Sequence, residues 1–89
     1  MEIYYADEFE KGYIKLPKQI KAKAETQEKL FINNPFYPSL HTEKLSPKSR
    51  EVWSFRIDKN YRIIFRFLNN DKVIFLNVGH HHWIYKTNL

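Results

Sequence analysis

The sequence contains no cysteine and only two glycines. Without cysteine, the chain has neither a disulfide framework nor a thiolate metal site to support a small core. So few glycines exclude a glycine-rich phosphate-binding loop, and neither a nucleophile elbow nor a zinc-protease motif occurs. We therefore predict that the protein works without a cofactor and without a bound metal.

Long apolar segments are also missing, and the first residues lack the basic and then apolar pattern of a secretion signal. We therefore expect no membrane partner and a cytoplasmic location. The 89 residues suit one domain, 1–89. The hydrophobic content of 43%, with seven phenylalanines, six tyrosines and two tryptophans, predicts a globular fold.

Positive charge is in excess, and its distribution is uneven. The net charge is +5, and seven basic residues against three acidic ones lie between positions 41 and 66. A basic region of this kind favours a polyanion or an acidic protein as the partner. Charge alone is equally compatible with an ordinary solvated surface.

The N-terminal half predicts one strand and two helices. Residues 2–6 predict a short strand, and apolar residues then recur at helical spacing. Leu16-Pro17 marks the junction of the two helices, because proline suits a first helical turn. Asn33-Asn34-Pro35 ends the second helix, and residues 35–50 predict a long loop. The expected buried positions of the helices are Phe9, Tyr13, Leu16, Ile20, Ala24, Gln27, Leu30 and Phe31.

The C-terminal half predicts three antiparallel strands. Residues 52–57 and 61–68 both alternate, and a short hairpin loop joins them. In the register that places the aromatic residues of both strands on one face, Arg56 lies opposite Arg62 on the other face. Like charges are unfavourable in such a pair, so we interpret it as functional.

The last hairpin extends this arrangement. Pairing Asn69 with Lys72 predicts a third strand and fixes its register. This register places Ile74, Leu76 and Val78 on the aromatic face, and Asn77, Gly79 and His81 on the arginine face. The predicted fold class is α+β, in the order β-α-α-β-β-β, with the two N-terminal helices packed on one face of a small, mostly antiparallel sheet.

The arginine face suits cleavage of RNA through its 2′-hydroxyl, which needs proton transfer and cations near the phosphate but no metal. Arg56 and Arg62 suit phosphate because guanidinium groups are planar and always charged. His81 suits a general acid or base because imidazole titrates near neutrality. Tyr85 is a candidate for base stacking or proton transfer, and equally for an ordinary packed aromatic residue.

The neighbouring histidines allow a second interpretation. His80 and His82 share one side of an extended strand, and imidazole binds zinc. No cysteine is present, and no carboxylate has ligand spacing. We therefore expect His80 and His82 to be surface residues.

Several segments form a recognisable order along nearly the whole chain. They are Leu16-Pro17-Lys18, Asn34-Pro35, Trp53 to Ile57, Tyr61 to Phe65, and Val78 to His81 followed by Tyr85. This order resembles the RelE/ParE superfamily of toxins. The resemblance implies a toxin of a type II toxin–antitoxin system, and a cognate acidic antitoxin as its partner.

Within the RelE-like branch, the resemblance implies an endoribonuclease, or mRNA interferase, that cleaves mRNA on the translating ribosome and inhibits translation. Arg56 and Arg62 then match the phosphate-binding positions, His81 the C-terminal acid, and Tyr85 the terminal aromatic residue.

Two positions depart from the pattern. Ser54 stands where some ribonucleases have a lysine, which leaves the general base unassigned, and His82 stands where many relatives have an aspartate. Lys44 and His41 are candidates for the base. We also expect Lys44, Arg66 and His41 to contact the substrate.

Two other functions are compatible with these residues. The ParE branch shares the fold but poisons DNA gyrase without catalysis. A basic RNA-binding module would keep the positive surface and would not need His81. The convergence of Arg56, Arg62 and His81 favours the nuclease, because a protein-binding poison does not require it.

Overall fold

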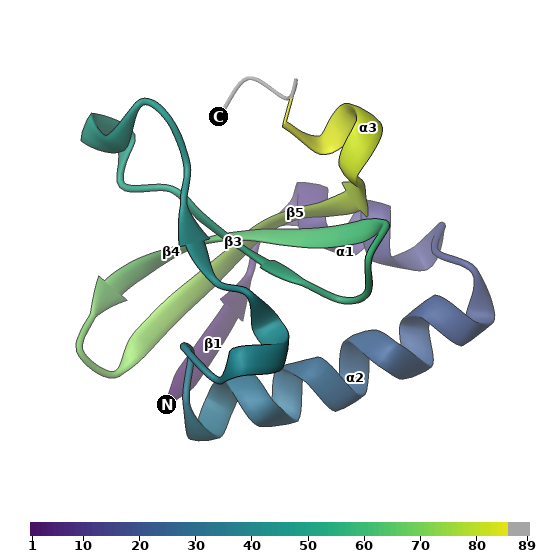
Figure 1. Ribbon diagram of the computed structural model, residues 1–89, viewed down its shortest axis with the longest axis horizontal. Coiled ribbons are helices and arrows are strands. Elements are labelled where there is room, and N and C mark those ends of the chain that lie inside the picture. The colour runs from purple at the N-terminus through teal and green to yellow at the C-terminus, as the bar shows by residue number, and fades with distance from the viewer. Residues whose placement is uncertain (86–89) are drawn as a thin grey trace.

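A computed structural model, which describes residues 1–85, shows a five-stranded sheet with two helices on one face (Figure 1). In chain order the elements are β1 (Glu2–Tyr5), α1 (Asp7–Ile14), α2 (Lys18–Asn33), η1 (Pro38–Leu40), β2 (Glu43–Lys44), η2 (Lys48–Arg50), β3 (Trp53–Arg56), β4 (Tyr61–Asn69), β5 (Lys72–His80) and α3 (His81–Ile84). The predicted α+β class and element order are confirmed, and β2 and α3 are additions to them. No helix among the described residues is long and apolar enough to cross a membrane.

The strands lie in the order β1-β5-β4-β3-β2. β1 runs parallel to β5, and every other neighbouring pair is antiparallel. The strand β2 corrects the prediction that residues 35–50 form only a loop. Two residues are too few to show a period in the sequence, and their conformation depends on pairing with the edge of β3.

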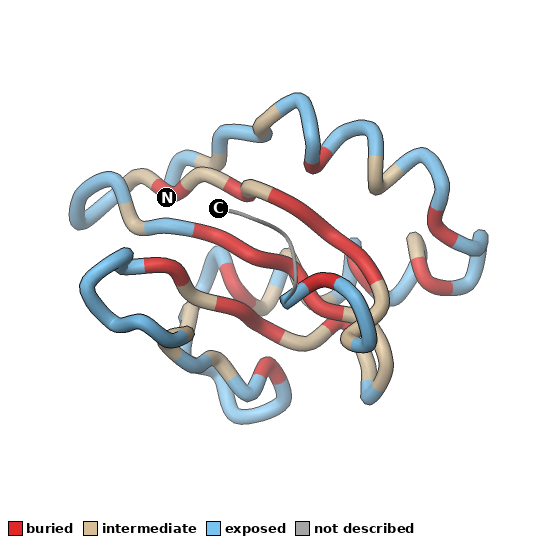
Figure 2. The backbone as a smooth tube through the Cα atoms, turned by 90° about the horizontal axis from the view of Figure 1, so that it is seen from above, coloured by how far each residue is buried: buried red, intermediate tan, exposed pale blue. Residues whose placement is uncertain are grey.

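The main core lies between the helices and the sheet. Phe31 of α2 is fully buried at its centre, with its ring 4.9 Å from Phe55, 5.0 Å from Phe65 and 5.6 Å from Phe75. Phe9 of α1 packs in the same cluster. Both helices therefore cover one face, as predicted, and Figure 2 shows the buried residues concentrated along the central strands.

The helices begin and end near the predicted residues. Pro17 is the N-terminal cap of α2, and Leu16 beside it is buried. Gln27 adds a polar link, because its side-chain amide donates a 2.9 Å hydrogen bond to the carbonyl of Arg56. This bond holds the end of β3 against α2.

The register of the last hairpin differs from the prediction in its middle. Asn69 pairs with Lys72, and Arg62 with Gly79, as expected. Between these pairs the register shifts twice, next to Ile64/Phe65 and next to Phe67/Asn69, so that Phe65 pairs with Phe75. Each shift is a bulge that adds one residue to one strand.

The two bulges change which side chains of β5 enter the main core. Val73 and Phe75 are fully buried there, and Val78 is buried as predicted. The placement of Ile74 and Leu76 in this core was wrong, because one shifted residue moves a side chain to the opposite face. Leu76 instead packs in a second cluster on the uncovered face.

Candidate active site

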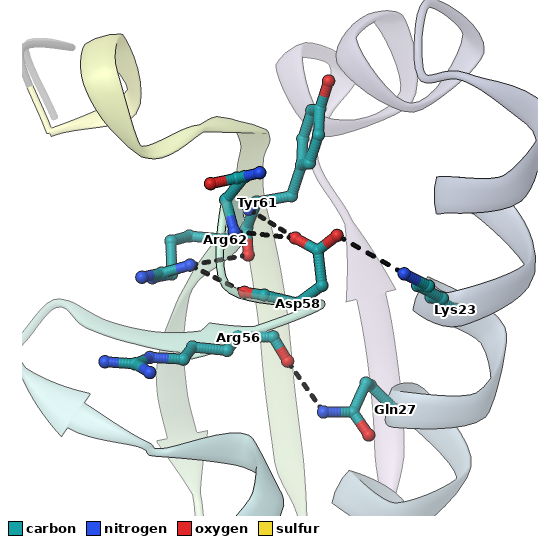
Figure 3. Close-up of polar contacts among 7 residues, drawn as sticks. Lys23, Gln27, Arg56, Asp58, Tyr61 and Arg62 are labelled. Carbon is teal, nitrogen blue, oxygen red and sulfur yellow. Dashed lines mark hydrogen bonds and ion pairs between the residues drawn. The ribbon is translucent and has the colours of Figure 1, made fainter.

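Arg56 and Arg62 lie directly opposite each other in the ladder between β3 and β4. Figure 3 shows both side chains extending to the side of the sheet away from α2. Arg62 is 9% exposed, and Arg56 is half-buried. Among residues 1–85, no carboxylate forms an ion pair with either guanidinium. The pair is therefore a positive site without an ion-paired carboxylate within the described chain.

The hairpin between β3 and β4 holds Arg62 in place. Its Nη1 donates a 2.8 Å hydrogen bond to the carbonyl of Asp58 and a 3.1 Å bond to the carbonyl of Tyr61. These bonds fix the stem of the side chain and the orientation of the guanidinium plane. Arg62 is thus a preorganised cation, whereas the side chain of Arg56 extends away from α2 without a dashed contact to the other residues drawn in Figure 3.

The side chain of Asp58 stabilises the same hairpin from the helix side. It accepts hydrogen bonds from the N–H groups of Asn60 at 2.8 Å and Tyr61 at 2.9 Å, and it lies 3.7 Å from Lys23 Nζ. Burial alone raises the pKa of Asp58. The two N–H donors and the charges of Lys23 and Arg62 outweigh burial, so the pKa lies below its ordinary value.

The short helix α3 returns over the uncovered face of the sheet, opposite α2 in Figure 1. Ile84 is fully buried there with Val52 and Ile64. Trp83 lies over Gly79, where an added Cβ would be 2.1 Å from the indole ring. Gly79 therefore allows the indole ring of Trp83 to approach β5 closely.

His81 begins α3 and does not continue β5, so its prediction as a strand residue was wrong. The N–H of His81 donates a 2.7 Å hydrogen bond to the carbonyl of Asn60 in the neighbouring hairpin, which anchors the start of α3 to that hairpin. Burial lowers the pKa of His81, and the adjacent His82 and His80 and the charge of Arg62 lower it further. The neutral imidazole is favoured, and this form accepts a proton.

Tyr85 follows α3 and lies over β3. Its hydroxyl is 3.5 Å from Oγ of Ser54, while 44% of the residue remains exposed. Ser54 is two positions before Arg56 and lies on the same face of the strand. The structure thus places Tyr85 on the arginine face, which alternation alone did not determine.

The three expected substrate contacts are placed differently. Arg66 is exposed on the arginine face, two positions beyond Ile64. Lys44 pairs with Trp53, and its Nζ lies 5.9 Å from the centre of that ring, which packs in the main core. Lys44 therefore lies on the other face from Arg56. His41 is exposed at the end of η1. Their contact with substrate stays a prediction.

Arg50 was not among the predicted site residues. It lines a hollow of about 460 Å³ together with Arg66, Ser49, Val52 and Leu76. This hollow continues the arginine face toward η2. The sequence identifies Arg50 only as a basic residue in a loop. Its position beside the sheet could not be predicted, because no periodicity relates Arg50 to the strands.

The arrangement places two guanidinium groups, an imidazole and a phenol on the same side of the sheet, with Arg62 largely buried and Tyr85 exposed. Guanidinium groups stabilise negative charge on phosphate oxygens, and an imidazole transfers protons near neutral pH. The four groups come from β3, β4 and the α3 segment. Groups of these types are suited to binding a phosphodiester and to proton transfer.

Comparison with known proteins gives one family match. The model of the HigB-like toxin family, described as the RelE-like toxin of the type II toxin–antitoxin system HigB, matches residues 7–81. A protein of Haemophilus influenzae, described as uncharacterized, is 41% identical over 34 residues. That match covers 38% of this chain and 34% of the other protein, so this chain spans about a third of the length of the Haemophilus influenzae protein.

Several solved structures share the fold. YafQ from Escherichia coli has a TM-score of 0.77 at 19% identity, covering 94% of this chain and 97% of that one. A chain of the RelB–RelE antitoxin–toxin complex from Methanococcus jannaschii has a TM-score of 0.74 at 24% identity, and the match covers 93% of this chain and 95% of that one. The YoeB/ParE toxin from Agrobacterium tumefaciens has a TM-score of 0.74 at 16% identity, and the match covers 91% of this chain and 99% of that one.

Proposed function

Because this chain belongs to the HigB-like family of RelE-like toxins of type II toxin–antitoxin systems, we propose that it is an endoribonuclease that cleaves mRNA on the ribosome and so inhibits translation. The observation that most supports this proposal is the Arg56–Arg62 pair, with which no carboxylate of residues 1–85 forms an ion pair. A polyanionic substrate supplies the negative charge that the fold leaves out.

In the proposed reaction, the scissile phosphate binds between Arg56 and Arg62. The neutral imidazole of His81 accepts the proton of the 2′-hydroxyl, and the 2′-oxygen attacks phosphorus. The bond from phosphorus to the 5′-oxygen breaks, and protonated His81 returns the proton to that oxygen. The products are a 2′,3′-cyclic phosphate and a 5′-hydroxyl, and the two arginines stabilise the charge that develops on the phosphate oxygens.

Tyr85 is proposed to contact the RNA beside the scissile phosphate. The residue is 44% exposed, and its hydroxyl faces Ser54 on the arginine face. An exposed phenol at this position suits stacking on an unpaired base. Lys44, Arg66 and His41 remain proposed contacts to RNA or the ribosome, and Arg66 has the most suitable position because it shares the arginine face.

The proposed partner is a cognate acidic antitoxin that covers the basic face. The net charge of +5 and the two arginines, which form no ion pair with a carboxylate of residues 1–85, favour such a partner. Co-expression of an acidic protein encoded beside this gene is expected to restore growth, and the complex is expected to weaken as salt increases. A complex that forms equally well with Arg56→Ala and Arg62→Ala would contradict binding over this face.

The proposed activity is tested by primer extension on mRNA from cells that briefly express the chain. Wild type is expected to produce new mRNA ends, and Arg62→Ala and His81→Ala are each expected to lower cleavage by roughly 100-fold or more. Lys29→Ala removes one positive charge from the exposed side of α2 and serves as the matched control. Purified ribosomes with mRNA, compared with free mRNA, test the dependence on the ribosome.

Two results would reject parts of this proposal. Growth arrest with accumulating DNA breaks and no new mRNA ends would favour a gyrase poison over the nuclease. Undiminished cleavage by His81→Ala would reject its role in proton transfer while leaving nuclease activity intact.

A further inference from the structure

Three imidazole rings lie side by side where β5 meets α3. The ring centroids of His80, His81 and His82 are 4.3 to 4.8 Å apart, and one nitrogen from each ring lies within 4.8 Å of the others. His80 and His81 are half-buried, and His82 is exposed. Among residues 1–85, no other group of three histidine, aspartate or glutamate side chains lies this close.

The backbone holds this histidine cluster together. His80 pairs with Tyr61 at the end of the β4–β5 ladder, and its ring packs edge-on against the Tyr61 ring at 5.3 Å. The N–H of His81 is bonded to the carbonyl of Asn60 at 2.7 Å. The turn into α3 then brings the ring of His82 to 4.6 Å from that of His80. The three rings are therefore held close together before a ligand arrives, and coordination requires them to turn from this stacked arrangement until one nitrogen of each faces the same ion.

We propose that His80, His81 and His82 bind a divalent first-row transition-metal cation such as Zn²⁺, and that the bound cation inhibits the toxin. Imidazole nitrogen is a preferred donor for these ions, whereas Mg²⁺ prefers oxygen ligands. Three protein ligands leave one position of a tetrahedral zinc ion for water. This site differs from the sequence-based expectation because the turn at His81 adds a third ring to His80 and His82.

The proposed inhibition by the cation depends on the proposed nuclease function, whereas the proposed binding of the cation does not. Coordination uses the lone pair of an imidazole nitrogen of His81, and the same imidazole is proposed to accept the proton of the 2′-hydroxyl. A cation at this position therefore competes directly with proton transfer.

Binding is also expected to change α3. Nδ1 of His80 accepts a 3.2 Å hydrogen bond from the N–H of His82, which is the side-chain cap of this helix. A neutral imidazole has only one nitrogen with a free lone pair. Coordination through either nitrogen of His80 therefore ends this hydrogen bond. Trp83 follows at once and packs on Gly79, so its fluorescence reports on the change.

Binding is tested first, with protein that has no polyhistidine tag. Calorimetric titration at neutral pH is expected to show one Zn²⁺ per chain and no binding of Mg²⁺. His82→Gln is expected to weaken Zn²⁺ binding by about tenfold or more, whereas His41→Gln, which removes the only histidine outside the cluster, leaves it unchanged. Zn²⁺ is also expected to change Trp83 fluorescence in a Trp53→Phe background. Equal Zn²⁺ affinities for wild type and His82→Gln would overturn the proposed site.

Cleavage is tested second. Zn²⁺ is expected to suppress mRNA cleavage by wild type, and a zinc-selective chelator is expected to restore it. His82→Gln, which is not assigned to cleavage, is expected to retain cleavage activity and to resist Zn²⁺. Undiminished cleavage at saturating Zn²⁺ would overturn the inhibition. A chain that binds Zn²⁺ but cleaves no mRNA in its absence would contradict the proposed function and leave the metal site standing.

Discussion

Arg56 and Arg62 lie directly opposite each other in the β3–β4 ladder, on the face of the sheet that α1 and α2 leave uncovered. Their like charges repel in the free protein, and a bound phosphate relieves this repulsion. The pair therefore lowers the stability of the free fold and raises its affinity for an anion. Stability and binding are expected to respond in opposite directions when one charge is removed.

The first prediction concerns Arg56→Gln. We expect the free energy of unfolding to rise by about 0.2–1 kcal/mol, because a like-charge pair is removed, and the gain to shrink at high salt. We expect mRNA cleavage to fall roughly 100-fold, because charge stabilisation at the phosphate is lost. Urea unfolding and a cleavage assay measure the two effects. A less stable variant would show that the charge repulsion is not the dominant effect.

Asp58 offers a prediction about pH. Asp58→Ala is expected to lower the free energy of unfolding by about 1–2 kcal/mol at neutral pH, because two N–H groups lose their acceptor. Asp58→Asn keeps an acceptor oxygen and is expected to lower the free energy of unfolding by less than Asp58→Ala does.

The sign of the pH effect follows from the lowered pKa of Asp58. The folded state favours the charged carboxylate, so its contribution is complete above the ordinary pKa of 3.8 and is lost as pH falls through the lower folded value. The difference in stability between wild type and Asp58→Asn should therefore narrow in acid. A difference that stays constant from neutral pH to strong acid would contradict this account.

The packing of Trp83 on Gly79 gives a third prediction. Gly79→Ala places a Cβ 2.1 Å from the indole ring, so the ring must move. We expect a loss of about 1–3 kcal/mol in unfolding free energy and reduced cleavage. In the double variant with Trp83→Ala the steric conflict is absent, so Gly79→Ala should cost much less there. Additive effects in this double-mutant cycle would show that the ring moves aside without cost.

Ile84 gives a fourth prediction, because it is the buried residue of α3. Ile84→Ala removes most of the side chain that packs with Val52 and Ile64, and α3 is expected to detach locally. We expect kcat to fall with little change in KM, because the arginines still bind RNA while His81 is misplaced. Leu68→Ala removes an apolar side chain that is 52% exposed and is the control. Equal losses in kcat for both variants would argue against a positioning role for Ile84.

The sequence predicted the arginine pair because two local patterns agree. Alternation assigned each side chain to a face, and the short hairpin fixed which residues oppose each other. The pairing of Arg62 with Gly79 followed from the next hairpin in the same way. Such local rules hold wherever a strand has one buried face and a tight turn.

The features that the sequence did not predict depend on contacts between residues that are far apart in the chain. The extra residue at Leu76 shifts the register of the hairpin, and the extra residue at Leu68 shifts it back. Both ends of the hairpin therefore match the simple prediction, whereas the pairing of Phe75 does not. The position of Tyr85 depends on Ile84 packing against Val52 and Ile64. The side of the sheet that Lys44 occupies depends on its pairing with Trp53. A single turn or a two-residue strand has too few residues to show a pattern.

The parallel pairing of β1 with β5 has a consequence for the order in which the fold assembles. Glu2 pairs with Lys72, so this edge of the sheet forms only after a long intervening loop has closed. The β3–β4–β5 meander needs only short loops, and its hairpins are able to form early. β1 is therefore expected to dock late in folding. Interactions made late in folding govern the unfolding rate, so the lifetime of the folded toxin depends on how firmly its first strand is held.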